Sequence, residues 1–177
     1  MDAVIPAAGR ESRLGSLTDD RPKRLVDVTG RPLIAHGFET AVEAGADKLV
    51  VIVGYEAARI VDRFGDVFEG TPITSVHQRE RKGLGHAALQ AEPHVDGTFP
   101  LVNGDTVFAE RVKPAVAAVG EADAALAVEE VSPAVATTIG VIETDEAGRV
   151  TKIVEKPTDP SSTLVTTGCY PLSQKDC

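Results

Sequence analysis

The sequence predicts an α/β protein with three layers, in which helices cover both faces of a mixed, mostly parallel sheet. Segments of strand and helix character alternate from the N-terminus to about residue 119. The strand predicted at 48–53 is an unbroken apolar run after its first residue, Lys48, as is typical of a parallel strand that is buried on both faces. After residue 122 strands follow one another directly, which indicates that antiparallel pairing is added to the parallel sheet.

The first half of the chain supplies the alternating elements. A short strand at 3–6 is followed by a helix at 32–44, which has Pro32 in its first turn, one apolar face and Gly45 at its end. The strand at 48–53 comes next. The other predicted elements of this half are a helix at 56–64, a strand at 73–77, a helix at 86–92, a strand at 99–102 and a helix at 111–119.

The second half is predicted to consist mainly of strands, at 122–131, 136–143, 149–155 and 164–170. The sequence Asp-Glu-Ala-Gly at 145–148 predicts a hairpin turn between two of them. Residues 157–162 are predicted to form a loop rather than a linker between domains. The chain of 177 residues is therefore expected to form a single domain over 1–177.

The composition argues against several classes of partner. A formal net charge of -9 disfavours nucleic acid and anionic membranes, which both attract basic surfaces. No apolar run reaches membrane-spanning length, and Met1 leads directly into a strand without a signal-peptide pattern, so the expected location is the cytoplasm. The two cysteines, Cys169 and Cys177, are expected to be free thiols, because no histidine cluster accompanies them.

The segment at 5–23 is the most informative functional signal. Its strand runs into three small residues, Ala7, Ala8 and Gly9. Small residues let backbone N–H groups approach an anion closely, and Arg13 and Lys23 supply charge suited to a polyphosphate. The segment matches neither the Walker A pattern nor Gly-x-Gly-x-x-Gly. It indicates a triphosphate-binding loop, against the alternative of a solvated loop with surface cations.

Two further clusters follow later strands. Gln78 offers a donor and an acceptor to a base edge, while Gly83 and Gly85 allow close approach of the backbone, although a plain loop explains the glycines equally well. His86 is expected to start a helix rather than to act as a catalyst. Asp105 follows a strand and is well placed to bind Mg²⁺, unless it only forms an Asx turn. In open α/β sheets such clusters meet beyond the carboxyl ends of the strands.

The first loop resembles the opening motif of the sugar-1-phosphate nucleotidylyltransferases. Residues 8–14 read Ala-Gly-Arg-Glu-Ser-Arg-Leu and residues 21–23 read Arg-Pro-Lys. The family motif is roughly Gly-Gly-x-Gly-Thr-Arg-Leu, a gap, then Pro-Lys, so that Ala8 and Ser12 are mild replacements. Glu11 is a real departure, since it places a carboxylate where the family keeps bare backbone near phosphate. It either weakens nucleotide binding or points to solvent.

The resemblance implies a Rossmann-like fold of the nucleotide-diphospho-sugar transferase type, with Asp105 as a ligand of Mg²⁺. Residues 82–87, which read Lys-Gly-Leu-Gly-His-Ala, resemble the base-recognition segment of the bacterial UTP–glucose-1-phosphate uridylyltransferases and so favour uracil. On the sugar side the resemblance implies that Glu155 accepts from sugar hydroxyls and Lys156 meets the sugar phosphate. Gly140 and Thr167 are assigned to the same subsite. Read from the residues alone, Glu155 and Lys156 could equally be an ordinary exposed pair.

The implied reaction transfers a nucleotidyl group from an NTP, with UTP favoured, to a hexose-1-phosphate, with glucose-1-phosphate favoured, and releases pyrophosphate. An oxygen of the sugar phosphate attacks the α-phosphorus in line and needs no general base. Catalysis then consists of holding two anions together and stabilising developing charge, which implies roles for Mg²⁺, Asp105, Arg13, Lys23 and Lys156.

Members of this family usually continue beyond the strand that matches 164–170 and carry a second metal-binding aspartate there. The chain is therefore expected to lack the family's C-terminal part, and the apolar sheet surface left exposed would favour association of copies. Three alternatives stay open: thymidylyl, guanylyl or adenylyl transfer; a truncated, non-catalytic nucleotide-binding remnant; and an unrelated α/β binding domain.

Overall fold

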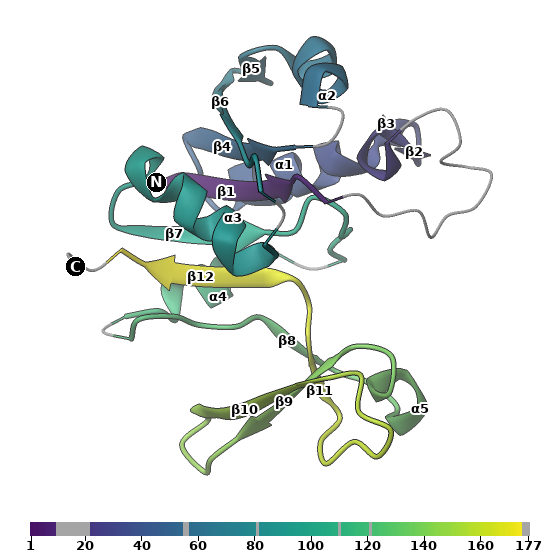
Figure 1. The fold of residues 1–177 in the computed structure, drawn as a ribbon. Coiled ribbons are helices and arrows are strands. Elements are labelled where there is room, and N and C mark those ends of the chain that lie inside the picture. The colour runs from purple at the N-terminus through teal and green to yellow at the C-terminus, as the bar shows by residue number, and fades with distance from the viewer. Residues whose placement is uncertain (10–21, 55–56, 81, 110, 121, 175–177) are drawn as a thin grey trace. The chain divides into compact units, whose positions relative to one another are not determined.

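The apolar runs of the sequence form a six-stranded sheet in the computed structural model, which describes residues 1–9, 22–54, 57–80, 82–109, 111–120 and 122–174. The strands lie in the order β12-β7-β1-β4-β6-β5 (Figure 1). Their bounds are Asp2–Ala7 for β1, Lys48–Val53 for β4, Val67–Phe68 for β5, Thr71–His77 for β6, Thr98–Val102 for β7 and Cys169–Ser173 for β12. β1 pairs in parallel with β4 and β7, and β4 with β6, whereas β5 is antiparallel to β6. The mixed, mostly parallel sheet is confirmed.

Helices connect these strands. Their bounds are Leu33–Glu43 for α1, Ala57–Phe64 for α2, Leu84–Ala91 for α3 and Lys113–Ala117 for α4, with 3₁₀ turns at Lys23–Leu25 (η2) and Glu92–His94 (η3). α1 begins directly after Pro32, and Gly45 beyond its end has a φ of +105°, a conformation that favours glycine. Among the described residues no helix is both long enough and apolar enough to cross a membrane.

One face of the sheet packs against α3. Side chains alternate along each strand, so Val4 of β1 and Val50 and Ile52 of β4 point to the same face. There they form a core with Ala87 and Ala91 of α3. The small alanines let the helix lie close to the strands, which brings the start of α3 to the ends of β1 and β4.

The opposite face packs against α1. Ile5 points to this face and lies beside Ile34 of α1. Phe38 of α1 is fully buried, and its ring meets those of Phe64 and Phe68 edge to face, with centroids 5.1 Å away in both pairs. Because α3 and α1 cover different faces, the predicted α/β/α layering is confirmed.

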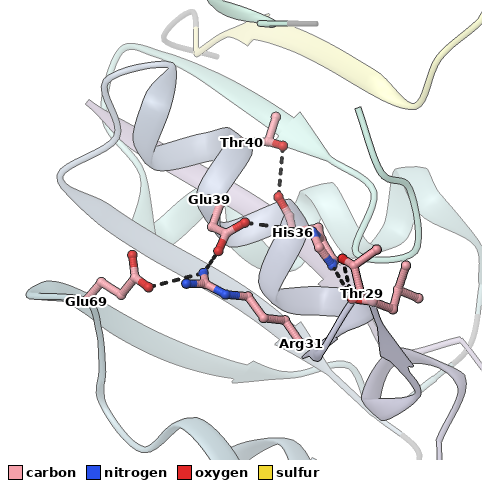
Figure 2. Close-up of polar contacts among 7 residues, drawn as sticks. Thr29, Arg31, His36, Glu39, Thr40 and Glu69 are labelled. Atoms are coloured by element: carbon pink, nitrogen blue, oxygen red, sulfur yellow. Dashed lines mark hydrogen bonds and ion pairs between the residues drawn. The ribbon is translucent and has the colours of Figure 1, made fainter. Parts of the chain in front are cut away.

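A polar network holds a small hairpin that follows η2. The hairpin consists of β2 (Asp27–Val28) and β3 (Arg31–Pro32). Arg31 lies between Glu39 of α1 and Glu69 of the β5–β6 turn, with 3.3 Å between its Nη1 and Glu69 Oε1 (Figure 2). His36 Nε2 lies 3.0 Å from the carbonyl oxygen of Val28. These contacts tie the hairpin, and with it the end of η2, to the rest of the first of two compact units, which is formed by Met1–Ala125 and Tyr170–Cys177.

The chain divides into two compact units, and the second spans Leu126–Cys169. Its four-stranded sheet has the order β10-β9-β11-β8, with bounds Val150–Glu155, Gly140–Thr144, Leu164–Thr166 and Val128–Glu130. Its small core consists of Ala136, Val141 and Val165. The predicted turn at 145–148 joins β9 to β10: the Asp145 carboxylate accepts from two backbone N–H groups, and Gly148 has a φ of +76°.

Several predicted elements of the second half are wrong in extent. The strand predicted at 136–143 begins only at Gly140, because Pro133 starts a short helix, α5 (Pro133–Ala136). The strand predicted at 122–131 shrinks to β8. The strand predicted at 164–170 is broken by Gly168, whose φ is +86°, so β11 and β12 join different sheets. Cys169 is the expected free thiol, buried so deeply that its pKa rises to about 11.

Candidate functional site

The parallel strands β1, β4, β6 and β7 all end at the same edge of the first unit's sheet. β1 is the point where the strand order reverses, since β4 lies on one side of it and β7 on the other. Open α/β sheets bind their ligands at such a point. A pocket of about 460 Å³ lies here, within the usual size of small-molecule sites. It is lined by Pro6, Ala8, Gly9, Arg24, Gln78, Gly83, Leu84, Ala87, Asn103 and Asp105.

Small residues make this edge compact. A Cβ on Gly54, which follows β4, would lie 2.8 Å from the Cβ of Ala8 and 2.9 Å from its carbonyl oxygen. A Cβ on Gly104 would lie 3.1 Å from the carbonyl oxygen of Pro6. The ends of β4 and β7 can therefore approach the end of β1 only because these two positions are glycine. Sequence reasoning did not single out either residue.

Lys23 and Asp105 meet at the rim of the pocket although they are 82 residues apart in sequence. Lys23 Nζ donates to Asp105 Oδ2 over 2.9 Å, and the two side chains are 19% and 20% exposed. η2 carries the lysine, and the turn after β7 carries the aspartate. A Cβ on Gly37 of α1 would lie 3.5 Å from the carbonyl oxygen of Asn103 and 3.7 Å from Cα of Gly104, so glycine at this position lets α1 approach the turn. The structure thus brings together a cation and a carboxylate that the sequence assigned to phosphate and metal.

Arg24 is a site residue that sequence reasoning missed. It is only 9% exposed, lines the pocket, and donates from Nη1 to the carbonyl oxygen of Gly9 over 2.8 Å. A Cβ on Gly9 would lie 3.2 Å from Nη2 of the same guanidinium. Arg24 therefore fixes the backbone of the small-residue loop where β1 ends. In the sequence, the only indication of this role was that Arg24 directly follows Lys23, a predicted site residue.

Gln78 is held at the base of the pocket by three hydrogen bonds. Its backbone N–H donates to the carbonyl oxygen of Val53, which continues the ladder between β4 and β6. Its side-chain Nε2 lies 3.3 Å from the carbonyl oxygen of Gly83 and 2.8 Å from His86 Nδ1. Gly83 has a φ of +88°, as the turn into α3 requires, whereas Gly85 lies within α3 and is not a lining residue. His86 is the third residue of that helix, near its start as predicted.

Two predicted residues of the phosphate loop, Arg13 and Glu11, lie outside the described residues. Ala7 is the last residue of β1 and is 1% exposed, so its side chain belongs to the core and only its backbone is available to a ligand. Within the described part of the loop, the backbone after β1 and the Lys23 ammonium are suited to an anion, as is the Arg24 guanidinium that lines the pocket.

The predicted sugar-side residues lie in the second unit, which is described by itself. Gly140 pairs with Glu155 across β9 and β10, and a Cβ on Gly140 would lie 3.3 Å from Glu155 Oε2. Lys156 has a φ of +46°, and its Nζ lies 3.2 Å from Glu155 Oε1, with side chains 45% and 72% exposed. Thr167 instead donates from Oγ1 to the carbonyl oxygen of Ala127 over 3.0 Å. Three of the four residues are therefore neighbours, with Glu155 and Lys156 exposed and Gly140 buried beneath them.

The described residues contain no group of three or more His, Cys, Asp or Glu side chains placed to hold a metal ion. Magnesium does not require such a group, because it commonly binds one or two carboxylates together with substrate phosphate oxygens and water. A lone Asp105 carboxylate at the rim of a pocket beside a lysine fits that ligand pattern.

The sequence profile of the family described as nucleotidyl transferase matches residues 2–175. The chain belongs to this family. It is 46% identical over 172 residues to UTP--glucose-1-phosphate uridylyltransferase AglF of Haloferax volcanii, a match that covers 96% of the chain and 71% of AglF. It is 34% identical over 175 residues to the bifunctional protein GlmU of Methanocaldococcus jannaschii, covering 99% of the chain and 40% of GlmU.

A solved structure of UDP-glucose pyrophosphorylase complexed with UDP-glucose superposes with a TM-score of 0.83 at 25% identity, covering 97% of the chain and 75% of that structure. The nucleotide-diphospho-sugar transferase fold and the membership in the sugar-1-phosphate nucleotidyltransferases are therefore confirmed.

Proposed function

We propose that the chain transfers a nucleotidyl group from an NTP, with UTP favoured, to a hexose-1-phosphate, with glucose-1-phosphate favoured, and releases pyrophosphate. The observation that carries the proposal is the pocket beyond β1, where a small-residue loop, Lys23, Asp105 and Gln78 converge. The choice of UTP and glucose-1-phosphate is supported by the name of AglF and by the UDP-glucose in the matching structure. AglF is longer than the region matched here, so the activity of the whole protein is part of the proposal.

Each residue has a part in this reaction. The backbone of Ala8 and Gly9 and the cations Arg13 and Lys23 hold the triphosphate, and Lys23 offsets charge as pyrophosphate leaves. Asp105 would hold Mg²⁺, which supplies further stabilisation of charge on the phosphate oxygens. In the unliganded chain, the ion pair between Lys23 and Asp105 keeps both side chains at the rim of the pocket.

The second unit supplies the sugar-phosphate residues in this proposal. Glu155 accepts from sugar hydroxyls, and Lys156 binds the phosphate whose oxygen attacks the α-phosphorus in line. Glycine at position 140 lets the Glu155 carboxylate lie close to the backbone of β9, since a Cβ there would be only 3.3 Å from Glu155 Oε2. The hydroxyl and the backbone N–H of Thr167 both donate to the carbonyl oxygen of Ala127, so Thr167 is assigned to this subsite through its own carbonyl oxygen. A phosphate anion is already a nucleophile at neutral pH, so no residue is assigned as a general base.

The proposal also covers the domain organisation, the location and the partners of the enzyme. The family match runs from residue 2 to 175, which supports treating both units as one nucleotidyltransferase domain. The net charge of -9 supports an enzyme without nucleic-acid or anionic-membrane partners, and the cytoplasm is proposed as its location. We also propose that copies of the chain associate with one another, and sedimentation of the purified chain measures its oligomeric state.

A second candidate is a nucleotide-binding protein without turnover, favoured by the carboxylate that Glu11 introduces into the phosphate loop. The two are separated by measuring pyrophosphate release from each NTP with glucose-1-phosphate and Mg²⁺. We expect release with UTP to exceed that with the thymidylyl, guanylyl and adenylyl donors. Binding of UTP without turnover of any pair would favour the second candidate instead.

A further inference from the structure

The side-chain amide of Gln78 has an unusual set of partners. Gln78 is 7% exposed and lines the pocket. Its Nε2 lies within hydrogen-bond distance of two atoms that belong to the start of α3, the carbonyl oxygen of Gly83 at 3.3 Å and Nδ1 of His86 at 2.8 Å. Both contacts involve the same amide nitrogen, which carries two hydrogens.

The chemistry of these partners fixes the orientation of the amide. A carbonyl oxygen can only accept, so the amide nitrogen of Gln78, and not its oxygen, must face Gly83. The second hydrogen then points to His86 Nδ1, which must offer a lone pair. His86 Nδ1 therefore accepts this hydrogen bond in the tautomer that carries the ring proton on Nε2.

This arrangement leaves one polar atom for a ligand. Both N–H groups of Gln78 are used, and among the described residues no donor lies within hydrogen-bond distance of Gln78 Oε1. The sequence alone allowed Gln78 to present a donor and an acceptor to a base. With the amide held this way it presents an acceptor only.

We propose that His86 is a positioning residue that sets base choice by holding the Gln78 amide with its oxygen toward the pocket. Uracil has an N–H at ring position 3, which an acceptor can bind, whereas cytosine has a lone pair at the same position, which an acceptor repels. A site of this kind selects UTP over CTP through the lost hydrogen bond and the clash of two acceptors. The inference deepens the proposed function and rests on it for the identity of the ligand.

The kinetic test compares two substitutions of His86. His86→Asn keeps an acceptor, since its Oδ1 occupies the place of Nδ1, whereas His86→Phe keeps a ring and removes the acceptor. We expect His86→Phe to lower the ratio of kcat/KM for UTP over CTP by about tenfold, the effect of one hydrogen bond. His86→Asn should restore most of that ratio. A ratio unchanged in His86→Phe, in an enzyme that turns over UTP, overturns the proposal.

A second readout does not depend on turnover. In protein labelled with ¹⁵N-histidine, the ring signals of His86 are assigned as those lost in His86→Asn, among the four histidines of the chain. We expect Nδ1 to be unprotonated and Nε2 protonated in the unliganded protein. A proton on Nδ1 overturns the proposal even if His86→Phe fails to fold. Absence of turnover with every NTP would instead refute the proposed function, and this measurement would still decide the role of His86.

Discussion

In the first unit, the charged pair at the pocket is largely enclosed, with Lys23 and Asp105 side chains 19% and 20% exposed. In the second unit, the corresponding pair is open to solvent, with Lys156 and Glu155 side chains 45% and 72% exposed. Exposed pairs contribute little to stability, whereas partly buried charges depend on their partners. The same kind of substitution should therefore affect both stability and activity in the first unit, but activity alone in the second.

The largest effects are expected at the enclosed pair. Lys23→Ala and Asp105→Asn should each lower kcat for pyrophosphate release about 10²–10³-fold, because each removes a charge from the reacting phosphates or from the metal. Lys113→Ala and Asp66→Asn, at exposed positions of the same unit, are the matched controls. Rates equal to those of the controls would remove Lys23 and Asp105 from the mechanism.

A glycine pair tests how tightly the edge of the first unit's sheet is built. Gly54→Ala should lower the free energy of unfolding by about 1–3 kcal/mol, because the new Cβ meets the backbone of Ala8 at 2.9 Å. Gly85→Ala meets nothing within 4 Å and lies in a helix, so it should raise stability by about 0.5–1 kcal/mol. Urea unfolding of both variants gives the comparison. Equal effects would mean that the strand ends are not in close contact.

Substitutions of the exposed pair, Glu155 and Lys156, are expected to change activity but not stability. Glu155→Gln and Lys156→Ala should raise KM for glucose-1-phosphate while changing the free energy of unfolding by less than about 0.5 kcal/mol. Lys23→Ala, measured alongside, should cost about 1 kcal/mol because it leaves Asp105 enclosed without this ammonium. A loss of stability at Lys156 as large as that at Lys23 would break the contrast between the two units.

The smallest effect is a pH dependence in the second unit. The hydroxyl of Ser161 donates to Glu143 and lowers the pKa of that carboxyl, with Lys152 adding a smaller effect. A lowered pKa gives stability that is present above the ordinary value and is lost as the pH falls through the folded value. Ser161→Ala should raise the pKa of Glu143, measured by NMR titration, and weaken this acid dependence. Ser132→Ala, which removes no cap bond from α5, should leave the titration unchanged.

The parallel part of the fold was predictable because its strands are read directly from the chain. A strand buried on both faces must be continuously apolar, and 48–53 was predicted with the bounds that β4 has. Parallel pairing then brings Gln78 and Asp105 to one edge without further information. The second half was harder, because Gly168 interrupts a run of strand character through its backbone conformation, which composition alone does not reveal.

The contacts within the site could not be predicted for a similar reason. Arg24 reaches Gly9, and His86 reaches Gln78, through the folded arrangement of separate segments. Motif comparison names residue types at positions, so it identified Lys23 and Asp105. Motif comparison does not identify residues, such as Arg24 and His86, whose role is to hold other residues in place.

The central claim is that the pocket beyond β1 binds a triphosphate and passes its α-phosphoryl group to a sugar phosphate. The most direct test incubates the chain with glucose-1-phosphate, Mg²⁺ and UTP labelled at either the α- or the γ-phosphate. We predict that the α label appears in UDP-glucose and the γ label in pyrophosphate, and that Asp105→Asn slows the appearance of both about 10²–10³-fold. Recovery of both labels in unchanged UTP, with every sugar phosphate tried, would contradict the claim.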